Sequence, residues 1–376
     1  MVSIGDKQIS GNDFYKVLIN NLELSLDEEA LRKVYRSHYF LKEFTREKLI
    51  YGINTGFGPM AQYRINHDDQ MKLQYNLIRS HCSGSGNPIP EIDCKAVMLA
   101  RLNTLMQGFA GIHPDALILI KDLINKNISP VIYEHGGLGA SGDLVQLAHL
   151  ALTLIGEGEV YYNGVITSTA EVFKKENITP MEIHIREGLA LMNGTSAMSG
   201  IGMLNVIYAQ NLMNWSLLAS ATIMELVQSF DDHYSTPLNE VKHHKGQNAV
   251  AKALQETLKD SKLVKSREEH HYKQKVEVDV LVEKMQEYYS IRCVPQIVGP
   301  IVDTVNYAQD VLINEINSAN DNPIVDWERK NVYHGGNFHG DYVALEMDKL
   351  KIAITKLSML AERQLNFLLN NKLNNI

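Results

Sequence analysis

The chain has 376 residues, 45% of them hydrophobic and 21% charged, a composition typical of a folded protein with a large buried core. Its net charge of -8 at pH 7 argues against a nucleic-acid surface, because such a surface needs clustered lysine and arginine. The three cysteines, Cys82, Cys94 and Cys293, are too scattered for a disulfide framework or a zinc ribbon.

Neither a leader peptide nor a membrane span is predicted. The N-terminus, MVSIGDKQISGNDF, contains no apolar stretch of the kind that secretion requires. The most apolar segment, residues 196–230, is interrupted by polar side chains that a bilayer core would not readily accept, among them Asn205, Gln210 and Glu225. We therefore expect a cytoplasmic protein with reduced thiols and no membrane association.

In chain order, the first clear elements are amphipathic helices. Apolar periodicity predicts a helix over residues 95–109, and a second over 115–126 follows Pro114, a favoured first helical position. A third helix is predicted to begin at Asp143. The clearest strand signal lies at 159–167, where Asn163-Gly164 is typical of a hairpin turn.

The rest of the chain is dominated by three very long predicted helices, at residues 196–230, 296–319 and 341–373. Helices of this length that are apolar over much of their circumference need other helices around them. The sequence therefore predicts a mostly α fold built on a long-helix bundle, and an oligomer.

The most informative short segment is EHGGLGASGDL at residues 134–144. Glycines before Ala140 and at Gly142 allow the backbone around Ser141 to bend in ways that other residues cannot. The segment is not a nucleophile elbow, because Asp143 stands where that motif needs glycine, and it lacks the lysine of a phosphate loop. Asp143 suits the positive end of the helix that it begins. Taken alone, these residues also fit a helix entry in which Ser141 merely caps.

A resemblance favours a chemical role. The ASGDL segment at residues 140–144 resembles the signature of the aromatic amino-acid ammonia-lyases, which include the histidine, phenylalanine and tyrosine enzymes. Further segments are similar to motifs of that family in the same order: YGINTGFG at 51–58, LMNGT at 191–195, QEYYSIRCVPQ at 286–296, NDNP at 320–323 and HGGNFH at 334–339. The resemblance covers essentially the whole chain, and within the family it is nearest to flavobacterial tyrosine ammonia-lyases.

The resemblance implies an architecture. It implies a bundle of the ammonia-lyase (fumarase/aspartase-like) type at residues 196–376, and a smaller N-terminal domain at 1–195 that carries the lid loop and the tripeptide. It also implies a homotetramer whose active sites are shared between subunits. The chain is shorter than usual for the family, and we expect the C-terminal part of the family fold to be absent.

The resemblance also implies a cofactor made from the chain itself. In the family the tripeptide, here Ala140-Ser141-Gly142, cyclises with loss of two waters to a 4-methylidene-imidazol-5-one (MIO). The nitrogen of Gly142 would close onto the carbonyl carbon of Ala140, and dehydration of Ser141 would leave the methylidene. A residue without a side chain at position 142 lets that nitrogen approach, and no metal or external cofactor is implied.

Catalytic roles follow residue by residue from the matching motifs. Tyr51 is implied as the general base, and its hydroxyl needs neighbouring positive charge or dipoles to act at neutral pH. Arg292 is implied to bind the substrate carboxylate through a bidentate pair. Asn193 and Tyr289 are implied as hydrogen-bonding partners of the MIO, the carboxylate or the amine.

Four further residues are implied to contact the substrate. Gln286 and Phe338 are expected to line the pocket, although core packing is an alternative for Phe338. The pair Ser80-His81 occupies the family's specificity position beside the substrate ring. A polar pair there argues against phenylalanine, whose enzymes carry an apolar pair.

The histidines do not form a metal motif in the sequence. The pairs at 243–244 and 270–271 are adjacent, so on a helix they point about 100° apart, unlike the i,i+4 pair of a zinc protease. His334 and His339 lack a companion carboxylate pattern. We assign no metal site from the sequence.

The predicted function is elimination of ammonia from an aromatic amino acid, with L-tyrosine giving p-coumarate as the favoured reaction. L-Histidine giving urocanate is an alternative, because His81 can pair with a phenol or an imidazole. An aminomutase that returns the amine to the β-carbon is a second alternative. A truncated, catalytically silent scaffold is a third, which the presence of Tyr51, Ser141 and Arg292 disfavours.

Overall fold

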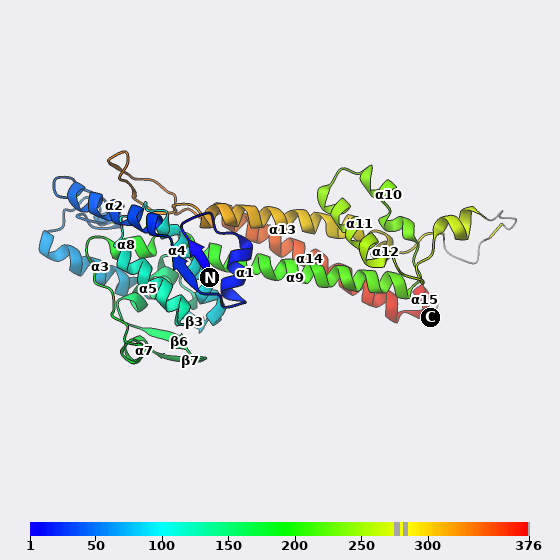
Figure 1. Ribbon diagram of the computed structural model, residues 1–376, viewed down its shortest axis with the longest axis horizontal. Coiled ribbons are helices and arrows are strands. Elements are labelled where there is room, and N and C mark those ends of the chain that lie inside the picture. Colours follow the sequence, from blue (N-terminus) through cyan, green and yellow to red (C-terminus); the bar gives the residue numbers. More distant parts are fainter. Residues whose placement is uncertain (274–278, 281–284, 375–376) are drawn as a thin grey trace. The chain divides into compact units, whose positions relative to one another are not determined.

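The computed structural model describes residues 1–273, 279–280 and 285–374, and the chain is mostly helical, as predicted (Figure 1). It forms two compact units, the first made of residues 1–205 and 310–344 and the second of 206–309 and 345–376. Three long helices each run through both units: α9 (Ser196–Leu226), α13 (Val294–Ile316) and α14 (Asp341–Leu369). The division into domains at 1–195 and 196–376 stays a prediction. Within the described ranges, no helix is long and apolar enough to cross a membrane.

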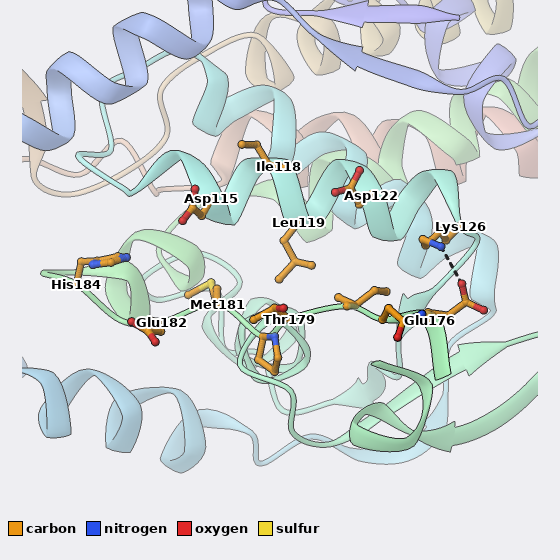
Figure 2. Close-up of a pocket in the computed structure, with 13 residues that line it drawn as sticks. Asp115, Ile118, Leu119, Asp122, Lys126, Glu176, Thr179, Met181, Glu182 and His184 are labelled. Carbon is orange, nitrogen blue, oxygen red and sulfur yellow. Dashed lines mark hydrogen bonds and ion pairs between the residues drawn. The ribbon is translucent and has the colours of Figure 1, made fainter. Parts of the chain in front are cut away.

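The first unit is organised around α4 (Glu91–Met106), in which every residue from Cys94 to Met106 is buried. This helix contacts α1 (Gly11–Leu18), α2 (Glu28–Phe44) and α5 (Pro114–Asn125). The remaining helices of the unit are α3 (His67–His81), the 3₁₀ turn η1 (Gly58–Met60), α6 (Leu144–Leu154), α7 (Thr169–Glu176) and α8 (Glu187–Met192). One side of α5 borders a cavity (Figure 2).

Short strands form four small sheets in this unit. The parallel pair is β1 (Val2–Ile4) with β2 (Leu24–Leu26), and the antiparallel pairs are β3 (Ser85–Pro88) with β5 (Tyr133–His135) and β8 (Ile324–Asp326) with β9 (Asn331–Tyr333). The fourth sheet has the order β4 (Ser129–Pro130), β6 (Glu159–Tyr162) and β7 (Val165–Ser168). The predicted hairpin is confirmed, since Asn163 and Gly164 connect β6 to β7 with φ values of 52° and 78°.

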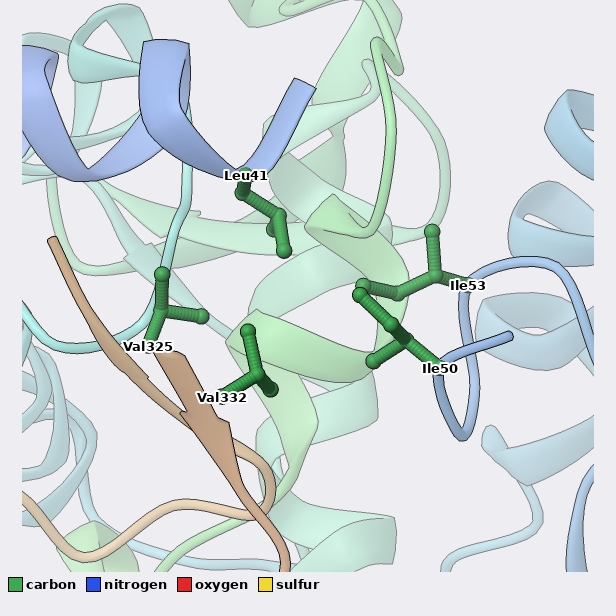
Figure 3. Packing of buried hydrophobic residues seen from close by; sticks show 5 residues of the cluster. All are labelled: Leu41, Ile50, Ile53, Val325 and Val332. Atoms are coloured by element: carbon green, nitrogen blue, oxygen red, sulfur yellow. The ribbon is translucent and has the colours of Figure 1, made fainter. Parts of the chain in front are cut away.

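A small hydrophobic cluster fixes the base of the loop that carries Tyr51. Ile50 and Ile53 pack with Leu41 of α2 and with Val325 and Val332 of the β8–β9 hairpin (Figure 3). Ile50 is 2% exposed and Ile53 1% exposed. Tyr51 therefore stands between two anchored side chains.

The second unit contains residues 206–226 of α9, 294–309 of α13 and 345–369 of α14. Its shorter helices and turns are η2 (Asp231–Tyr234, a 3₁₀ turn), α10 (Thr236–Glu240), α11 (Lys245–Leu258), η3 (Glu268–Tyr272, a π-helical turn), α12 (Tyr289–Arg292) and α15 (Asn371–Asn374). Gln364 of α14 donates hydrogen bonds to the hydroxyl of Ser220 in α9 and to the carbonyl of Ser290, at 2.9 and 3.0 Å. A buried amide thus connects three segments of this unit.

All three long helices end earlier than predicted, and α13 stops at Ile316, not at residue 319. Helix α9 stops at Leu226, not at residue 230, because Gln228 has a φ of 50° and Ser229 N donates to Met224 O, which closes a Schellman motif. Helix α14 stops at Leu369, not at residue 373. The Asn370 side chain accepts from Lys372 N at 3.1 Å and starts a separate turn, α15.

Candidate active site

A cavity of about 330 Å³ in the first unit brings together residues from four of the sequence motifs. Its polar residues are Tyr51, His81, Ser141, Asn193 and Asn322. Its walls are otherwise apolar, formed by Phe57, Leu77, Leu144, Leu189 and Met192 with Gly58. Apolar walls with a few convergent polar groups suit a small ligand that has a hydrophobic body and polar ends.

The Ala140-Ser141-Gly142 segment is a tight turn whose last residue must be glycine. Gly139 and Ala140 each form a backbone bridge with Gly142, so the chain doubles back on itself here. Gly142 has a φ of +75°, and a Cβ atom at this position would overlap the carbonyl oxygen of Gly194. The next residue is tied to the same carbonyl, because Asp143 N donates to Gly194 O at 2.8 Å.

Asp143 stabilises a different helix from the one expected. Its Oδ2 accepts hydrogen bonds from Ala197 N and Met198 N, at 2.8 and 2.9 Å, in the first turn of α9. It makes no side-chain capping bond to α6, the helix that it precedes. Burial raises the pKa of Asp143 to about 6, while the two N–H donors and the charge of Arg101 oppose this increase. At neutral pH the carboxylate is therefore ionised and bound to the positive end of α9.

Asn193 donates hydrogen bonds to Ser141, and its own backbone carbonyl is held by Arg101. Its Nδ2 donates to Ser141 O at 3.0 Å and to Ser141 Oγ at 3.3 Å. The backbone carbonyl of Asn193 accepts from the Arg101 guanidinium at 2.9 Å, and the same nitrogen donates to Ala190 O. Arg101 is fully buried, and this burial lowers its pKa to about 10, so it remains a cation at neutral pH.

Tyr51 faces the cavity from a loop with weaker contacts. Its Oη accepts a hydrogen bond from Gly58 N at 3.3 Å, and its backbone N donates to His334 Nε2 at 3.4 Å. The buried amide of Gln74 secures the neighbouring residue, donating to Gly52 O at 2.8 Å and accepting from Leu189 N at 3.1 Å. Gln74 thus connects the Tyr51 loop to α8, which leads directly to Asn193.

His81 lines the cavity, while its neighbour Ser80 does not. His81 Nδ1 lies 2.9 Å from Leu77 O, an acceptor, which assigns the proton to Nδ1 and leaves Nε2 as an acceptor. Ser80 Oγ donates to the same carbonyl at 3.1 Å and lies 3.2 Å from His81 Nδ1. Ser80 therefore contacts the His81 ring and the end of α3.

The other predicted residues lie elsewhere. Phe338 is half-buried in the first unit and is not among the residues that line this cavity. Gln286, Tyr289 and Arg292 belong to the second unit. There the Arg292 guanidinium lies 4.6 Å from the ring centroid of Tyr289 and donates to Glu287 O at 2.9 Å, and Tyr289 is 70% exposed. Of the predicted site residues, the cavity thus brings together Tyr51, His81, Ser141 and Asn193.

Two supporting residues were missed by sequence reasoning. Arg101 lies inside the apolar helix predicted at 95–109, and a lone arginine in such a helix is a signal for a buried polar contact. Gln74 gave no comparable signal, because a glutamine on an amphipathic helix is ordinarily exposed. Its partners, Gly52 and Leu189, are distant in the sequence.

Residues 9–376 match the family model of the aromatic amino acid lyases. The chain is 40% identical over 372 residues to a tyrosine 2,3-aminomutase of Myxococcus sp. (strain Mx-B0), an alignment that covers 96% of this chain and 70% of that protein. It is 36% identical over 371 residues to a histidine ammonia-lyase of Halalkalibacterium halodurans, covering 98% and 70% of the two chains. The crystal structure of a tyrosine aminomutase from Streptomyces globisporus matches with a TM-score of 0.94 at 34% identity, covering 99% of this chain and 72% of that one.

Proposed function

Since the chain belongs to the aromatic amino acid lyase family and is therefore a carbon–nitrogen lyase, we propose that it converts L-tyrosine into p-coumarate and ammonia. The observation that carries this proposal is the convergence of Tyr51, His81, Ser141 and Asn193 on one largely apolar cavity. Tyr51, Ser141 and Asn193 come from three separate motifs and His81 from the specificity position, and each offers a polar group that the elimination needs.

The family depends on a self-formed MIO, and we propose that Ala140-Ser141-Gly142 forms it in this chain. The turn fits the group, because Gly142 is paired with Ala140 and has no space for a side chain. Asn193 Nδ2 already donates to both oxygens of Ser141. Once formed, the MIO supplies an electrophile that makes the substrate amine a better leaving group.

Tyr51 is the proposed base for the β-proton of the substrate. The Gly58 N–H that points at its Oη stabilises negative charge on that oxygen. The loop glycines give this segment freedom to close over a ligand and exclude water. The buried neighbours Ile50 and Ile53 keep the start of the loop in place during such a movement.

His81 is the proposed partner of the substrate ring. With its proton on Nδ1, the free Nε2 accepts a hydrogen bond from a phenol O–H or an imidazole N–H, and phenylalanine offers neither. A buried polar group left unpaired lets a site reject the analogue that lacks the donor by ~10⁴-fold. Among the relatives, the tyrosine aminomutases favour tyrosine over histidine as the substrate of this chain.

Arg292 remains the proposed partner of the substrate carboxylate. Its guanidinium is oriented by the Tyr289 ring and by the Glu287 carbonyl, which engages NH1. A planar guanidinium can bind a carboxylate through two parallel hydrogen bonds, a geometry that lysine does not offer.

The deciding experiment is incubation of the full chain with L-tyrosine, L-histidine or L-phenylalanine, followed by chromatographic identification of the products. We expect p-coumarate at the highest kcat/KM, and no product from the control variant Ser141→Ala, which lacks the hydroxyl that dehydration requires. A preference for urocanate formation would contradict the tyrosine assignment. Absence of every product would favour the silent scaffold.

A tyrosine 2,3-aminomutase is the second candidate, and the 40% identity to such an enzyme favours it. The same residues would start both reactions, because a mutase also removes the amine before returning it to the β-carbon. Chiral chromatography of the tyrosine reaction separates the two. β-Tyrosine as the main product would replace the lyase proposal with the mutase.

We also propose that the chain assembles as a homotetramer. Large apolar side chains are exposed along the long helices, among them Trp215 at 62%, Ile352 at 64% and Leu369 at 78%. Exposed apolar surface of this kind is typical of protein–protein contacts. Light scattering coupled to size-exclusion chromatography should give a mass four times that of the chain.

A further inference from the structure

A second cavity, of about 480 Å³, lies between α5 and residues 176–184 of the first unit. Figure 2 shows acidic side chains around it, with Asp115 and Asp122 on α5 and Glu176 and Glu182 on the facing segment. Glu176 is paired with Lys126 at 2.8 Å, at the opposite end from His184. The surroundings therefore favour a cationic ligand at the end where Asp115 and His184 lie.

Three side chains of types that can coordinate a metal ion lie close together at that end. One ligand atom from each of His113, Asp115 and His184 lies within 4.8 Å of the other two. His113 Nδ1 is 3.3 Å from Asp115 Oδ2 and also accepts from Asp115 N at 3.3 Å, and the rings of His113 and His184 have centroids 4.2 Å apart. A third imidazole, His38, lies 4.9 Å from the His113 ring, with Nδ1 bonded to Gly111 O.

A single buried carboxylate holds the two histidine-bearing segments together. Glu187 is fully buried, and its Oε1 accepts from His113 N at 3.1 Å. Its Oε2 accepts from His184 N and Ile185 N, at 2.7 and 2.8 Å. Glu187 thus fixes the backbone at both His113 and His184, so little ordering of the chain would be needed to bind an ion.

The chemistry of the donors selects the type of ion. Two imidazoles and one carboxylate suit zinc, nickel or cobalt, whereas magnesium and calcium prefer oxygen ligands alone. Among the described residues, none is hydrogen bonded to the ring nitrogens of His184, and its ring is exposed.

We propose that His113, Asp115 and His184 form a binding site for a divalent transition-metal ion of the zinc class. The site is separate from the proposed catalytic cavity, and it does not depend on the proposed reaction. A bound ion would bridge the N-terminus of α5 and the segment that leads into α8, the helix that precedes Asn193.

The proposal is tested by calorimetric titration of Zn²⁺ and Mg²⁺ into the chelator-treated chain of 376 residues. We expect one equivalent of Zn²⁺ to bind, and Mg²⁺ to bind at least tenfold more weakly. His184→Ala and Asp115→Asn replace exposed side chains and should each weaken Zn²⁺ binding at least tenfold. The matched control is His135→Ala, which removes another exposed histidine that lies beside a carboxylate, 4.0 Å from Glu134, and should leave the affinity unchanged.

Co²⁺ provides a readout of direct coordination. We expect d–d absorption bands on adding Co²⁺ to the wild-type chain, and their loss in His184→Ala. Circular dichroism checks that each variant is folded. Zn²⁺ binding with the same affinity in wild type, His184→Ala and His135→Ala would indicate an adventitious ion only and would overturn the proposal.

Discussion

Gly142 and Gly58 both border the candidate active site with positive φ angles, +75° and +51°, but their surroundings differ. A Cβ at Gly142 would overlap backbone atoms of Gly194, whereas a Cβ at Gly58 would have no atom within 4 Å. The tripeptide loop is therefore packed against another part of the backbone, while the tip of the Tyr51 loop lies in open space. The first arrangement suits a ring closure that needs fixed atoms, and the second suits a lid.

The tripeptide loop also has shorter hydrogen bonds than the Tyr51 loop. Asp143, at the end of the tripeptide loop, accepts two hydrogen bonds at 2.8 and 2.9 Å and is buried. Tyr51 makes hydrogen bonds of 3.3 and 3.4 Å and is half-exposed. The comparison indicates that the tripeptide is positioned by the fold, whereas the proposed base would complete its position on closure of its loop.

The largest expected effect is that of Gly142→Ala. The added methyl group cannot fit beside Gly194 O, so the turn should open and cyclisation should fail. The intact mass of wild type should be two waters below that of its sequence, and the mass of the variant should equal that of its sequence. Gly139→Ala is the matched control, because Gly139 also has a positive φ, +71°, but no atom within 4 Å of an added Cβ. Full cyclisation of Gly142→Ala would show that the loop is not as constrained as described.

Tyr51→Phe should reduce kcat by ~10²–10⁴-fold, the usual effect of removing a positioned general base. The loss of two waters should be unaffected, because the tripeptide loop does not depend on the Tyr51 hydroxyl. Steady-state kinetics and intact mass measure the two effects separately. Tyr63→Phe, in the same loop and 54% exposed, is the control and should retain wild-type turnover. Wild-type kcat in Tyr51→Phe would remove Tyr51 from the mechanism.

The hydrogen bond between Tyr51 N and His334 Nε2 should make the Tyr51 loop sensitive to pH. Partial burial and the charge of Arg186 lower the pKa of His334 below its usual value of 6.5. The folded-state pKa is depressed, so the contribution of this bond is present above pH 6.5 and is lost as the pH falls through the lowered pKa. Hydrogen exchange at Tyr51 N, corrected for the intrinsic rate, should show several-fold less protection at pH 5 than at pH 7.5.

In His334→Ala, Tyr51 N should be as weakly protected from exchange at pH 7.5 as it is at pH 5. His135→Ala is the control and should behave like wild type. Equal protection of wild type at the two pH values would mean that His334 does not hold the loop.

The smallest expected effect is that of Gly58→Ala. Only the positive φ opposes the substitution, at a cost of about 1–2 kcal/mol, because there is space for the methyl group. We expect less than a tenfold change in kcat and full loss of two waters. A large kinetic effect without a change in mass would show that the tip of the loop is as constrained as the tripeptide.

The parts of the molecule that follow from local rules were predicted well. Asn163-Gly164 makes a hairpin because both residues tolerate positive φ, and Gly142 is required by its own turn. The bodies of the long helices follow from apolar periodicity. Their ends did not follow, since the Schellman motif after Leu226 depends on Gln228 adopting a conformation more typical of glycine or asparagine.

Contacts between distant segments could not be predicted in this way. No local pattern indicates that Gln74 bonds both Gly52 and Leu189, or that Arg101 binds the carbonyl of Asn193. The histidine cluster was missed for the same reason, because His113 and His184 are brought together by Glu187 and not by their spacing. Sequence motifs predicted the reacting residues, and the three-dimensional structure was needed to find the residues that hold them in place.

The two hydrogen bonds from the start of α9 to Asp143 have a consequence for the order of events during synthesis. The tripeptide leaves the ribosome well before Gly194, Ala197 and Met198, the residues whose backbone groups hold the loop in its tight turn. Until they emerge, their backbone groups cannot hold residues 140–142 in this turn. The proposed ring closure would therefore wait until α9 has begun to fold, so that a reactive methylidene would not be exposed on an unfinished chain.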